Sequence, residues 1–456
     1  MTSRLDLLIR GGELVTPTGL VRADLGIADG RIAKIAPEIS EPAAEFLDAT
    51  GQVVFPGILD AHVHFNAPGR ADWEGLVTGP RALAAGGGTV FFDMPLNSLP
   101  PVLDRASFAE KQALAERESC LDFALWGGLT PGNLGRLGEL AEAGAVGLKA
   151  FLCASGVEEF EAVTDRRTLA AGMKEAAELG MPVAVHTEDD ALTFRLTGEA
   201  RARGERDTRA WLATRPVEAE VTAIRMALEA AGEAGCALHV VHVSSPEGLA
   251  EIAEGRRQGV DVSAEICPHY LLLTEDDVLT LGAPAKCAPP LRDGARREGL
   301  WQALEDGGVD TVGSDHSPAP PALKGSADFF EVWGGISGCQ HGFPLLISEA
   351  LTRRPAAEAL PLLARLLAAN VASRFGLADR KGRISEGLDA DLTLLRLDAP
   401  HTLDNADLLY RHPQGPYHSR PCRVRVVRTL ARGATVFTVE DPIHSSHRGR
   451  LLRPEP

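Results

Sequence analysis

The chain has 456 residues, of which 45% are hydrophobic and 24% are charged, and these values are close to those of ordinary globular proteins. They exclude a disordered chain, a collagen-like chain and a bare coiled coil. The 63 acidic residues outnumber the 46 basic ones and give a formal net charge of −17. A surface of this sign repels nucleic acids and anionic membranes, so we expect neither as a partner.

Cysteine usage and the N-terminus indicate a compartment. The seven cysteines form no CxxC pair and no dense framework, which indicates free thiols in a reducing compartment. Asp6, Arg10 and Glu13 interrupt the short apolar start of the chain, so no signal peptide is expected. No uncharged apolar run reaches the roughly 18 residues that a membrane helix needs. The expected location is the cytoplasm.

Residues 1–56 have the pattern of short strands separated by turns. The segments 7–12, 25–30 and 31–35 alternate apolar with polar residues or end in glycine. A segment of this length is too small to form a hydrophobic core of its own. We therefore expect it to pair with another part of the chain.

Residues 57–376 alternate apolar runs with stretches rich in Ala, Leu, Glu and Arg, such as 108–118 and 217–231. The expected strands are 58–64, 89–94, 122–126, 146–152, 182–186, 238–243, 260–266 and 309–314. Eight buried strands with helix-sized gaps between them predict an α/β fold with a (β/α)8 TIM barrel. A doubly wound open sheet is the alternative.

Strand patterns return in residues 377–456, at 382–387, 391–395 and 424–427. Their composition resembles that of residues 1–56, so we predict that both ends of the chain form one small β-sandwich domain. The tail from His444 is polar and contains arginine, and we expect it to be loosely ordered.

The strongest local motif is Asp60-Ala61-His62-Val63-His64. Side chains at positions i and i+2 of a strand point to one face, so His62 and His64 can reach one point. Neutral imidazole is the commonest metal ligand in proteins. The motif ends the first barrel strand, where barrel enzymes keep their chemistry. Taken alone, two such histidines are equally well explained as part of a surface strand.

Four further residues stand near the same end of other expected strands. His186 ends the fifth strand, His242 lies in the sixth, Asp315 follows the eighth, and Lys149 lies inside the fourth. Each alone would more often be structural, since an aspartate after a serine, for example, is often a helix cap. Six suitable residues near one end of five strands indicate a shared site.

Lys149 is the most informative of the six. The chain has only seven lysines, and an ammonium group in an apolar strand is expensive to bury. If its amine adds carbon dioxide, the resulting carbamate has one negative charge and two oxygens and can bridge two divalent cations. The alternative is an ion pair with a buried carboxylate, for which Asp93 on the second strand is a candidate.

These residues and their order resemble the cyclic amidohydrolase branch of the amidohydrolase superfamily, over nearly the whole chain. The branch contains dihydroorotases, dihydropyrimidinases or hydantoinases, and allantoinases. The resemblance implies a homotetramer and two metal ions, one held by His62, His64, Lys149 and Asp315 and the other by Lys149, His186 and His242. It also implies carbon dioxide as the source of an N6-carboxylated Lys149. The mixed ligands suit Zn²⁺, while Co²⁺, Mn²⁺, Fe²⁺ or Ni²⁺ could occupy the same site.

Within the branch, the chain is most similar to allantoinases. The similarity is carried by the segments 68–75, 94–97, 267–270, 286–293, 314–318, 333–336 and 410–412. Dihydroorotases have an arginine where this chain has Asn66, and dihydropyrimidinases have a tyrosine where it has Ala154. Some allantoinases have a serine in place of Ala288, which leaves only a backbone contact there.

The resemblance implies hydrolysis of a cyclic amide in the hydantoin ring of allantoin, giving allantoate. Asp315 would bind metal and carry the proton of the attacking water to the leaving nitrogen. Substrate contacts are expected at Asn66, Asn97, Ala288 and Gly335. Two alternatives stay open: a hydantoinase or dihydropyrimidinase that acts on another cyclic imide, and a non-catalytic scaffold.

Overall fold

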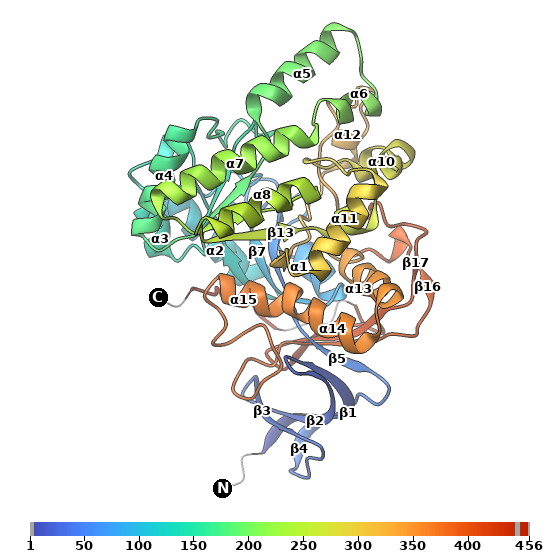
Figure 1. Cartoon of the computed structure of the whole chain (residues 1–456). Coiled ribbons are helices and arrows are strands. Elements are labelled where there is room, and N and C mark those ends of the chain that lie inside the picture. The colour runs from blue at the N-terminus through green and yellow to red at the C-terminus, as the bar shows by residue number, and fades with distance from the viewer. Residues whose placement is uncertain (1–3, 443–446, 455–456) are drawn as a thin grey trace.

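Both ends of the chain contribute strands to one sheet (Figure 1). In the computed structural model, which describes residues 4–442 and 447–454, the sheet has the order β19-β18-β15-β5-β1-β2-β3, and β4 pairs with β1. Its strands are β1 (Leu5–Thr16), β2 (Gly19–Ala28), β3 (Arg31–Ala36), β4 (Ala43–Asp48), β5 (Val53–Pro56), β15 (Leu392–Arg396), β18 (Arg425–Ala431) and β19 (Ala434–Thr438). Alternating residues of these strands, among them Leu7, Ile9, Leu25 and Leu392, form a separate buried cluster.

One strand expected in this domain is absent from the described residues. Residues 382–387 form bends and turns instead, and the prediction of a strand there was wrong. Gly382 and Gly387 have φ angles of +94° and +88°, which extended backbone does not adopt. The segment instead presents Ile384 to the core of the β domain.

The middle of the chain forms a closed barrel of parallel strands. They are β6 (Ile58–Val63), β7 (Gly88–Asp93), β8 (Asp122–Leu125) continued by β9 (Gly127–Gly128), β10 (Leu148–Phe151), β11 (Val183–His186), β12 (Leu238–Val240), β13 (Val262–Ile266) and β14 (Thr311–Val312). Parallel pairing joins β6 to β7 and β8, and β9 to β10 through β14. A parallel bridge between Val63 and His316 closes the circle. The barrel prediction is confirmed, and this closure rules out the open sheet.

Helices surround the barrel (Figure 1), and polar side chains cap the starts of several of them. They include α1 (Thr78–Ala85), α2 (Arg105–Glu118), α3 (Gly138–Ala143), α4 (Arg166–Glu178), α7 (Val217–Ala234), α8 (Pro246–Arg257), α11 (Gly294–Glu305) and α13 (Gly342–Arg353). The side chains of Asp104, Asp165 and Ser245 accept backbone hydrogen bonds at the starts of α2, α4 and α8. Helices α5 (Asp190–Ala202) and α6 (Thr208–Ala213) extend from the end of the molecule opposite the β domain.

One continuous helical stretch, residues 356–374, is long and apolar enough to cross a membrane by length and composition alone. It comprises α14 (Ala356–Ala364), a π-helical turn and α15 (Asn370–Arg374), and half of its most apolar window is buried in the protein. Such burial is what a core helix shows.

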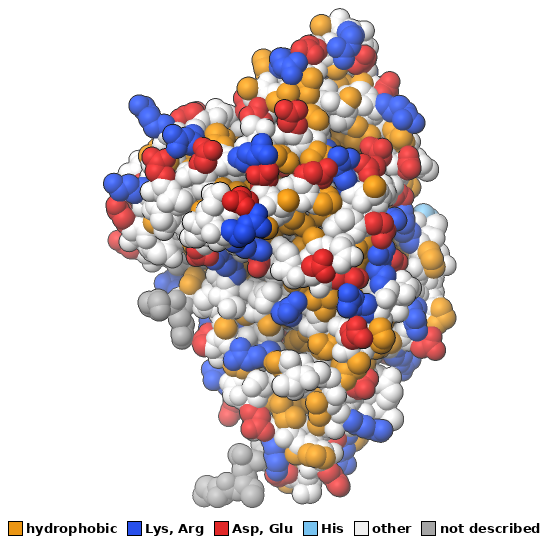
Figure 2. Space-filling view, viewed as in Figure 1, with side chains coloured by type: hydrophobic (Ala, Val, Ile, Leu, Met, Phe, Trp, Pro, Cys, Tyr) orange, Lys and Arg blue, Asp and Glu red, His pale blue; other side chains and the backbone are white. Residues whose placement is uncertain are grey.

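On the face of the molecule in Figure 2, acidic and basic side chains are interspersed across the surface.

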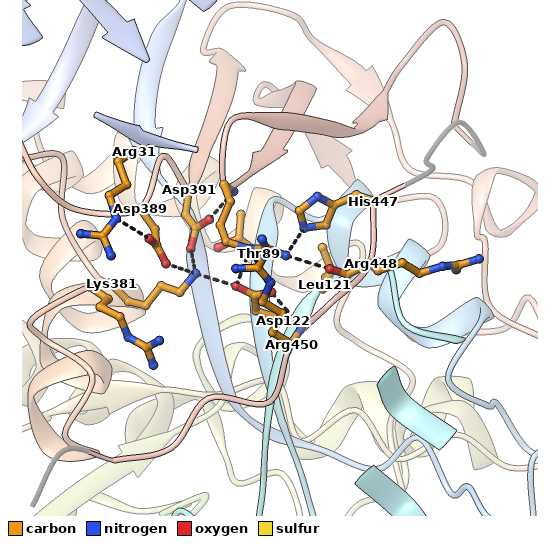
Figure 3. A network of polar contacts seen from close by, with 12 residues as sticks. Arg31, Thr89, Leu121, Asp122, Lys381, Asp389, Asp391, His447, Arg448 and Arg450 are labelled. Atoms are coloured by element: carbon orange, nitrogen blue, oxygen red, sulfur yellow. Dashed lines mark hydrogen bonds and ion pairs between the residues drawn. The ribbon is translucent and has the colours of Figure 1, made fainter. Parts of the chain in front are cut away.

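Buried ion pairs join the β domain to the floor of the barrel (Figure 3). Lys381 is 1% exposed, and its Nζ lies 2.7–2.9 Å from carboxylate oxygens of Asp122, Asp389 and Asp391. Arg432 Nε contacts Asp122 at 3.1 Å. Burial alone would lower the pKa of Lys381, but the three carboxylates outweigh it and raise the pKa above its usual range. Because Asp122 begins β8, the network lies at the end of the barrel away from the predicted ligands.

The C-terminal tail pairs with this floor, contrary to our expectation of loose order. Phe123 N donates to Arg450 O at 3.0 Å, and Leu452 N donates to Phe123 O at 2.7 Å. Leu452 is 2% exposed. The prediction was wrong for residues 449–452, because β10 pairs with β9 and leaves the edge of β8 near Phe123 open. His444, where the predicted tail begins, lies outside the described residues.

Candidate metal centre and substrate pocket

All six predicted ligands lie at the carboxyl ends of barrel strands. His62 and His64 are at the end of β6, Lys149 is in β10, His186 ends β11, His242 follows β12 and Asp315 follows β14. All six are at most 8% exposed. His242 and Asp315 have φ angles of +42° and +44°, an uncommon conformation for residues with a side chain and one that concentrates at functional sites.

Asp315 lies between the two histidines of the HxH motif. Its Oδ1 is 3.3 Å from His62 Nε2 and 3.3 Å from His64 Nε2. Burial alone would raise the pKa of Asp315, but the neighbouring imidazoles of His62, His64 and His242 hold it well below its usual range. Asp315 is therefore an anion at neutral pH and is ready to bind a cation.

His186 and His242 face each other across the same space. Their Nδ1 and Nε2 atoms, respectively, are 3.0 Å apart. Burial is the largest cause that lowers the pKa of both rings. The positive charges of Lys149 and Arg215 also lower the pKa of His186, and His186 and Lys149 also lower the pKa of His242. Both imidazoles are therefore neutral at pH 7, which is the form that binds metal.

Lys149 is fully buried, and its Nζ has no hydrogen-bond partner in the described part of the chain. The amine lies 4.8 Å from the centroid of the Phe151 ring. Burial lowers the pKa of Lys149 to about 8, although Asp315 and Glu265 act in the opposite direction. A pairing with Asp93 is not found, because Asp93 lies 2.9 Å from Lys111 Nζ instead.

This donor set fits divalent metal ions. Ligand atoms of His62, His242 and Asp315 lie within 4.8 Å of one another. Neutral imidazoles, a carboxylate and a lysine without a counter-ion converge here, and nitrogen and oxygen donors of this kind bind Zn²⁺ and its neighbours. An unpartnered buried amine is otherwise costly, so the cluster is explained better as a metal site than as a set of core residues.

The cluster lies in a cavity of about 300 Å³. Three predicted substrate-contact residues, Asn97, Ala288 and Gly335, line this cavity, together with Arg215, Trp333 and others. Asn66 is not among the lining residues; its Nδ2 donates to Pro318 O at 3.3 Å. Gly335 uses its own backbone N–H for Lys286 O, at 2.8 Å. The cavity is therefore large enough for a small cyclic molecule, and polar groups of the ligand cluster are among its lining residues.

Comparison with known proteins identifies the family. The sequence profile described as "Amidohydrolase family" matches residues 53–436. The chain belongs to the amidohydrolase family. An allantoinase of Solibacter usitatus and one of Deinococcus radiodurans are each 51% identical over 450 residues, covering 99% of this chain and 97% and 99% of theirs. The L-hydantoinase (dihydropyrimidinase) of Arthrobacter aurescens has a similar structure, with a TM-score of 0.91 and 32% identity over 99% of this chain and 98% of its own.

Members of this family depend on metal, and in this chain further residues orient the candidate ligands. Glu265 in β13 accepts a hydrogen bond from His62 Nδ1 at 2.7 Å, which leaves Nε2 free to bind metal. On the other side, Glu188 Oε2 lies 2.9 Å from His186 Nε2 and 2.7 Å from Arg215 Nη1. Our sequence analysis missed both glutamates. A glutamate inside the apolar run 262–266 is the same signal that singled out Lys149.

Asn97 supports His64 in the same way. Its side-chain amide lies 3.3 Å from His64 Nδ1, while Asn97 Oδ1 is buried and has no partner among the described residues. A 180° rotation of the amide places the oxygen against Nδ1–H. That arrangement satisfies both groups and is the one a ligating His64 Nε2 requires. Asn97, predicted as a substrate contact, therefore also touches a candidate ligand.

Proposed function

We propose that this member of the amidohydrolase family hydrolyses the cyclic amide bond in the hydantoin ring of allantoin to give allantoate. The observation that carries the proposal is the complete cluster of six buried ligand-type residues, five of which line one cavity, with Lys149 buried beside them. Segments 286–288 and 333–335, which resemble allantoinases in sequence, line the same cavity. Relatives that share nearly the whole length of the chain are allantoinases, which supports the choice of substrate.

We further propose that the centre holds two divalent ions, with Zn²⁺ as the expected metal. His62, His64, Lys149 and Asp315 would hold one ion, and Lys149, His186 and His242 the other. Lys149 would be carboxylated by carbon dioxide. Support comes from its position: burial lowers the pKa of Lys149 to about 8, so its nucleophilic neutral amine is available near neutral pH.

The metals, when bound, would supply Lewis-acid chemistry that activates water and polarises a carbonyl. The chain's own residues supply orientation and proton transfer. Asp315 is anionic and lies against His62 and His64, so its carboxylate can accept the proton of the attacking water and return it to the leaving nitrogen. Glu265 holds the ring of His62 in one tautomer throughout.

Two other functions receive less support. A dihydropyrimidinase or hydantoinase activity has the structural likeness in its favour, but position 154, where dihydropyrimidinases have a tyrosine, is an exposed alanine. A non-catalytic scaffold has no need for six buried ligand-type residues or for an unpartnered lysine. Both are decided by the same experiment.

The deciding experiment compares allantoin, hydantoin, dihydrouracil and dihydroorotate as substrates of the Zn²⁺-loaded protein. We expect turnover of allantoin to exceed that of the other three. Activity confined to dihydrouracil would contradict the proposal, and no activity together with no bound metal would favour the scaffold. Mass spectrometry of the intact protein should show the added mass of the carboxylate on Lys149, and a bare amine in active, metal-replete protein would refute carboxylation.

We also propose a cytoplasmic homotetramer with a small-molecule cyclic ureide as substrate. The seven cysteines are all buried free thiols, in keeping with a reducing compartment. Domain borders after residues 56 and 376 agree with the positions of β5, β6, α15 and β15. Light scattering of the purified chain would test the tetramer.

A further inference from the structure

The outer wall of the cavity is a stretch of irregular backbone. We use the term outer wall for residues 329–335, of which residues 330–335 line the cavity. Only turns and bends occur in this segment, so most of its carbonyl groups have no partner in a helix or sheet. Two lysines from outside the segment provide donors for these carbonyls.

Lys324, at the end of the short helix α12 (Pro321–Lys324), provides three donors. Its Nζ lies 2.6 Å from Gly335 O, 3.0 Å from Trp333 O and 3.2 Å from Ala283 O. An ammonium group has three N–H bonds, so each finds an acceptor. Lys324 therefore ties the end of the outer wall to the loop that contains Ala283.

Lys286 ties the start of the outer wall. It is 3% exposed, and its Nζ donates to Phe329 O at 2.5 Å and Val332 O at 2.6 Å. The rings of Trp211 and Phe329 lie 4.7 and 4.9 Å from the same nitrogen, within the range of cation–π attraction. In return, Lys286 O accepts a hydrogen bond from Gly335 N. Lys286 itself lines the cavity.

Lys286, which is buried, and Lys324, which is partly buried, differ from the buried lysines Lys111 and Lys381. Lys111 and Lys381 pair with aspartates, whereas neither Lys286 nor Lys324 has an ion pair with a carboxylate in the described residues. Removing an ammonium from water without a counter-ion is expensive, so its retention at two neighbouring places calls for a function that neutral side chains would not perform. Both places are in contact with the outer wall.

Tight packing also restricts where the outer wall can lie. A Cβ added to Gly335 would lie 2.3 Å from Ser317 O, so the outer wall packs against the adjacent backbone of Ser317 without room for a side chain. Trp333 N donates to Leu323 O, and its ring packs on Trp73 at 4.9 Å with an interplanar angle of 77°. The segment is thus held at several points close to the ligand cluster.

We propose that Lys286 and Lys324 are positioning residues that clamp the outer wall in the conformation that binds substrate. The inference rests on the proposed function, because it takes the ligand of the cavity to be allantoin. A wall fixed before binding saves the ordering cost that a mobile segment would incur on each encounter. The clamp therefore acts on substrate affinity more than on the chemical step.

The test uses the Zn²⁺-loaded full chain and the variants Lys324→Met and Lys286→Met, with Lys174→Met on the exposed surface of α4 as the control. Methionine keeps the length of the side chain and removes the charge and the donors. We expect each clamp variant to raise KM for allantoin by about 10-fold or more while kcat changes by less than about 3-fold. Hydrogen exchange of residues 329–335 should become faster in the same variants.

The possible results distinguish a failure of the clamp proposal from a failure of the proposed function. Unchanged KM in both clamp variants, or a fall in kcat at constant KM, would overturn the clamp. If Lys286→Met does not fold, Lys324→Met alone decides, since that residue is only partly buried. Hydrogen exchange tests the clamp without substrate: unchanged protection of 329–335 overturns it. A wild-type chain that does not hydrolyse allantoin refutes the proposed function instead.

Discussion

A buried lysine lies at each end of the barrel, and the two lysines differ in their partners and in the direction of their pKa shifts. We call the end with the candidate ligands the mouth and the end with Lys381 the floor. At the floor, Lys381 is surrounded by three aspartates, and its pKa is raised. At the mouth, the Lys149 amine has no hydrogen-bond partner among the described residues, and burial lowers its pKa to about 8. The floor residue is satisfied by carboxylates of the protein itself, as a structural ion pair must be. The contrast is what supports our proposal that Lys149 belongs to a functional site, where buried groups with shifted pKa values concentrate.

The largest effect should come from Lys149→Met. Under the proposed assignment Lys149 would be a ligand of both ions, and such a ligand would contribute more than the roughly 10–100-fold of a supporting residue. We therefore expect turnover to fall by at least about 10³-fold. The stability of the metal-free protein should stay the same or increase, since the variant removes a buried amine without a partner. Elemental analysis, turnover and urea unfolding measure these quantities.

Partial recovery of Lys149→Ala by a small carboxylic acid would show that a carboxylate is what the site lacks. Full metal content together with full activity in either variant would contradict the assignment of Lys149.

The matching change at the floor is Lys381→Met. It takes the lysine partner from the buried carboxylates of Asp122 and Asp391 and from the partly buried Asp389, and of the two buried groups only Asp122 keeps a cation, Arg432. The free energy of unfolding should therefore fall by about 3–5 kcal/mol. Turnover per folded molecule should not change. The control is Lys34→Met, which removes a solvent-accessible pair with Glu41 and should leave the free energy of unfolding nearly unchanged. A loss of activity without a loss of stability in Lys381→Met would contradict the structural role of this lysine.

This ion pair also has a defined pH dependence. The pKa of Lys381 is raised in the folded state above its ordinary value of 10.5. Its contribution to stability is therefore complete below about pH 10.5 and is lost as the pH rises through the higher folded value. Unfolding in urea at pH 9 and pH 11 should show wild type losing more stability than Lys381→Met.

Leu452→Ala tests the docking of the tail on the floor. Truncation of this buried side chain should reduce the free energy of unfolding by about 2–3 kcal/mol without affecting turnover. Arg448→Ala, an exposed change in the same segment whose backbone contact with Arg432 remains, is the control. Equal stability of Leu452→Ala and wild type would show that the tail does not contribute.

The smallest expected effect is that of Glu265→Gln. The amide keeps the size of the side chain but loses the charge that favours the Nδ1–H tautomer of His62. Metal affinity or turnover should fall by about 10–100-fold. Competition with a chelator measures the affinity, and Glu247→Gln on the surface should match wild type. If metal affinity and turnover are both unchanged, Glu265 does not support metal binding by His62.

The residues that could be predicted from the sequence are those with a local signature. His62 and His64 form a motif, and Lys149 is a charge in an apolar run. Glu265 has the same local signature as Lys149, but its role depends on His62, which is 203 positions away in the sequence. That proximity follows from closure of the barrel and cannot be read from spacing along the chain.

The barrel was predictable because each of its strands is a short apolar run between helices, and this pattern repeats. The tail was not, because residues 449–452 pair through backbone groups with an edge that exists only in the folded barrel. Polar side chains say nothing about such pairing. The lysine clamp was missed for the same reason, since its acceptors are carbonyl groups, which every residue has.

The order of strands in the shared sheet has a consequence for synthesis on the ribosome. Strand β5 pairs on one side with β1 and on the other with β15, which begins only at Leu392. At about 5–20 residues per second, the open edge of β5 waits for tens of seconds while the whole barrel is made. During that interval, the first five strands are a half-built sheet with an unpaired edge, the form in which chains pair with the wrong neighbour. The newly made N-terminal segment is therefore open to mispairing until residues 392–396 are made.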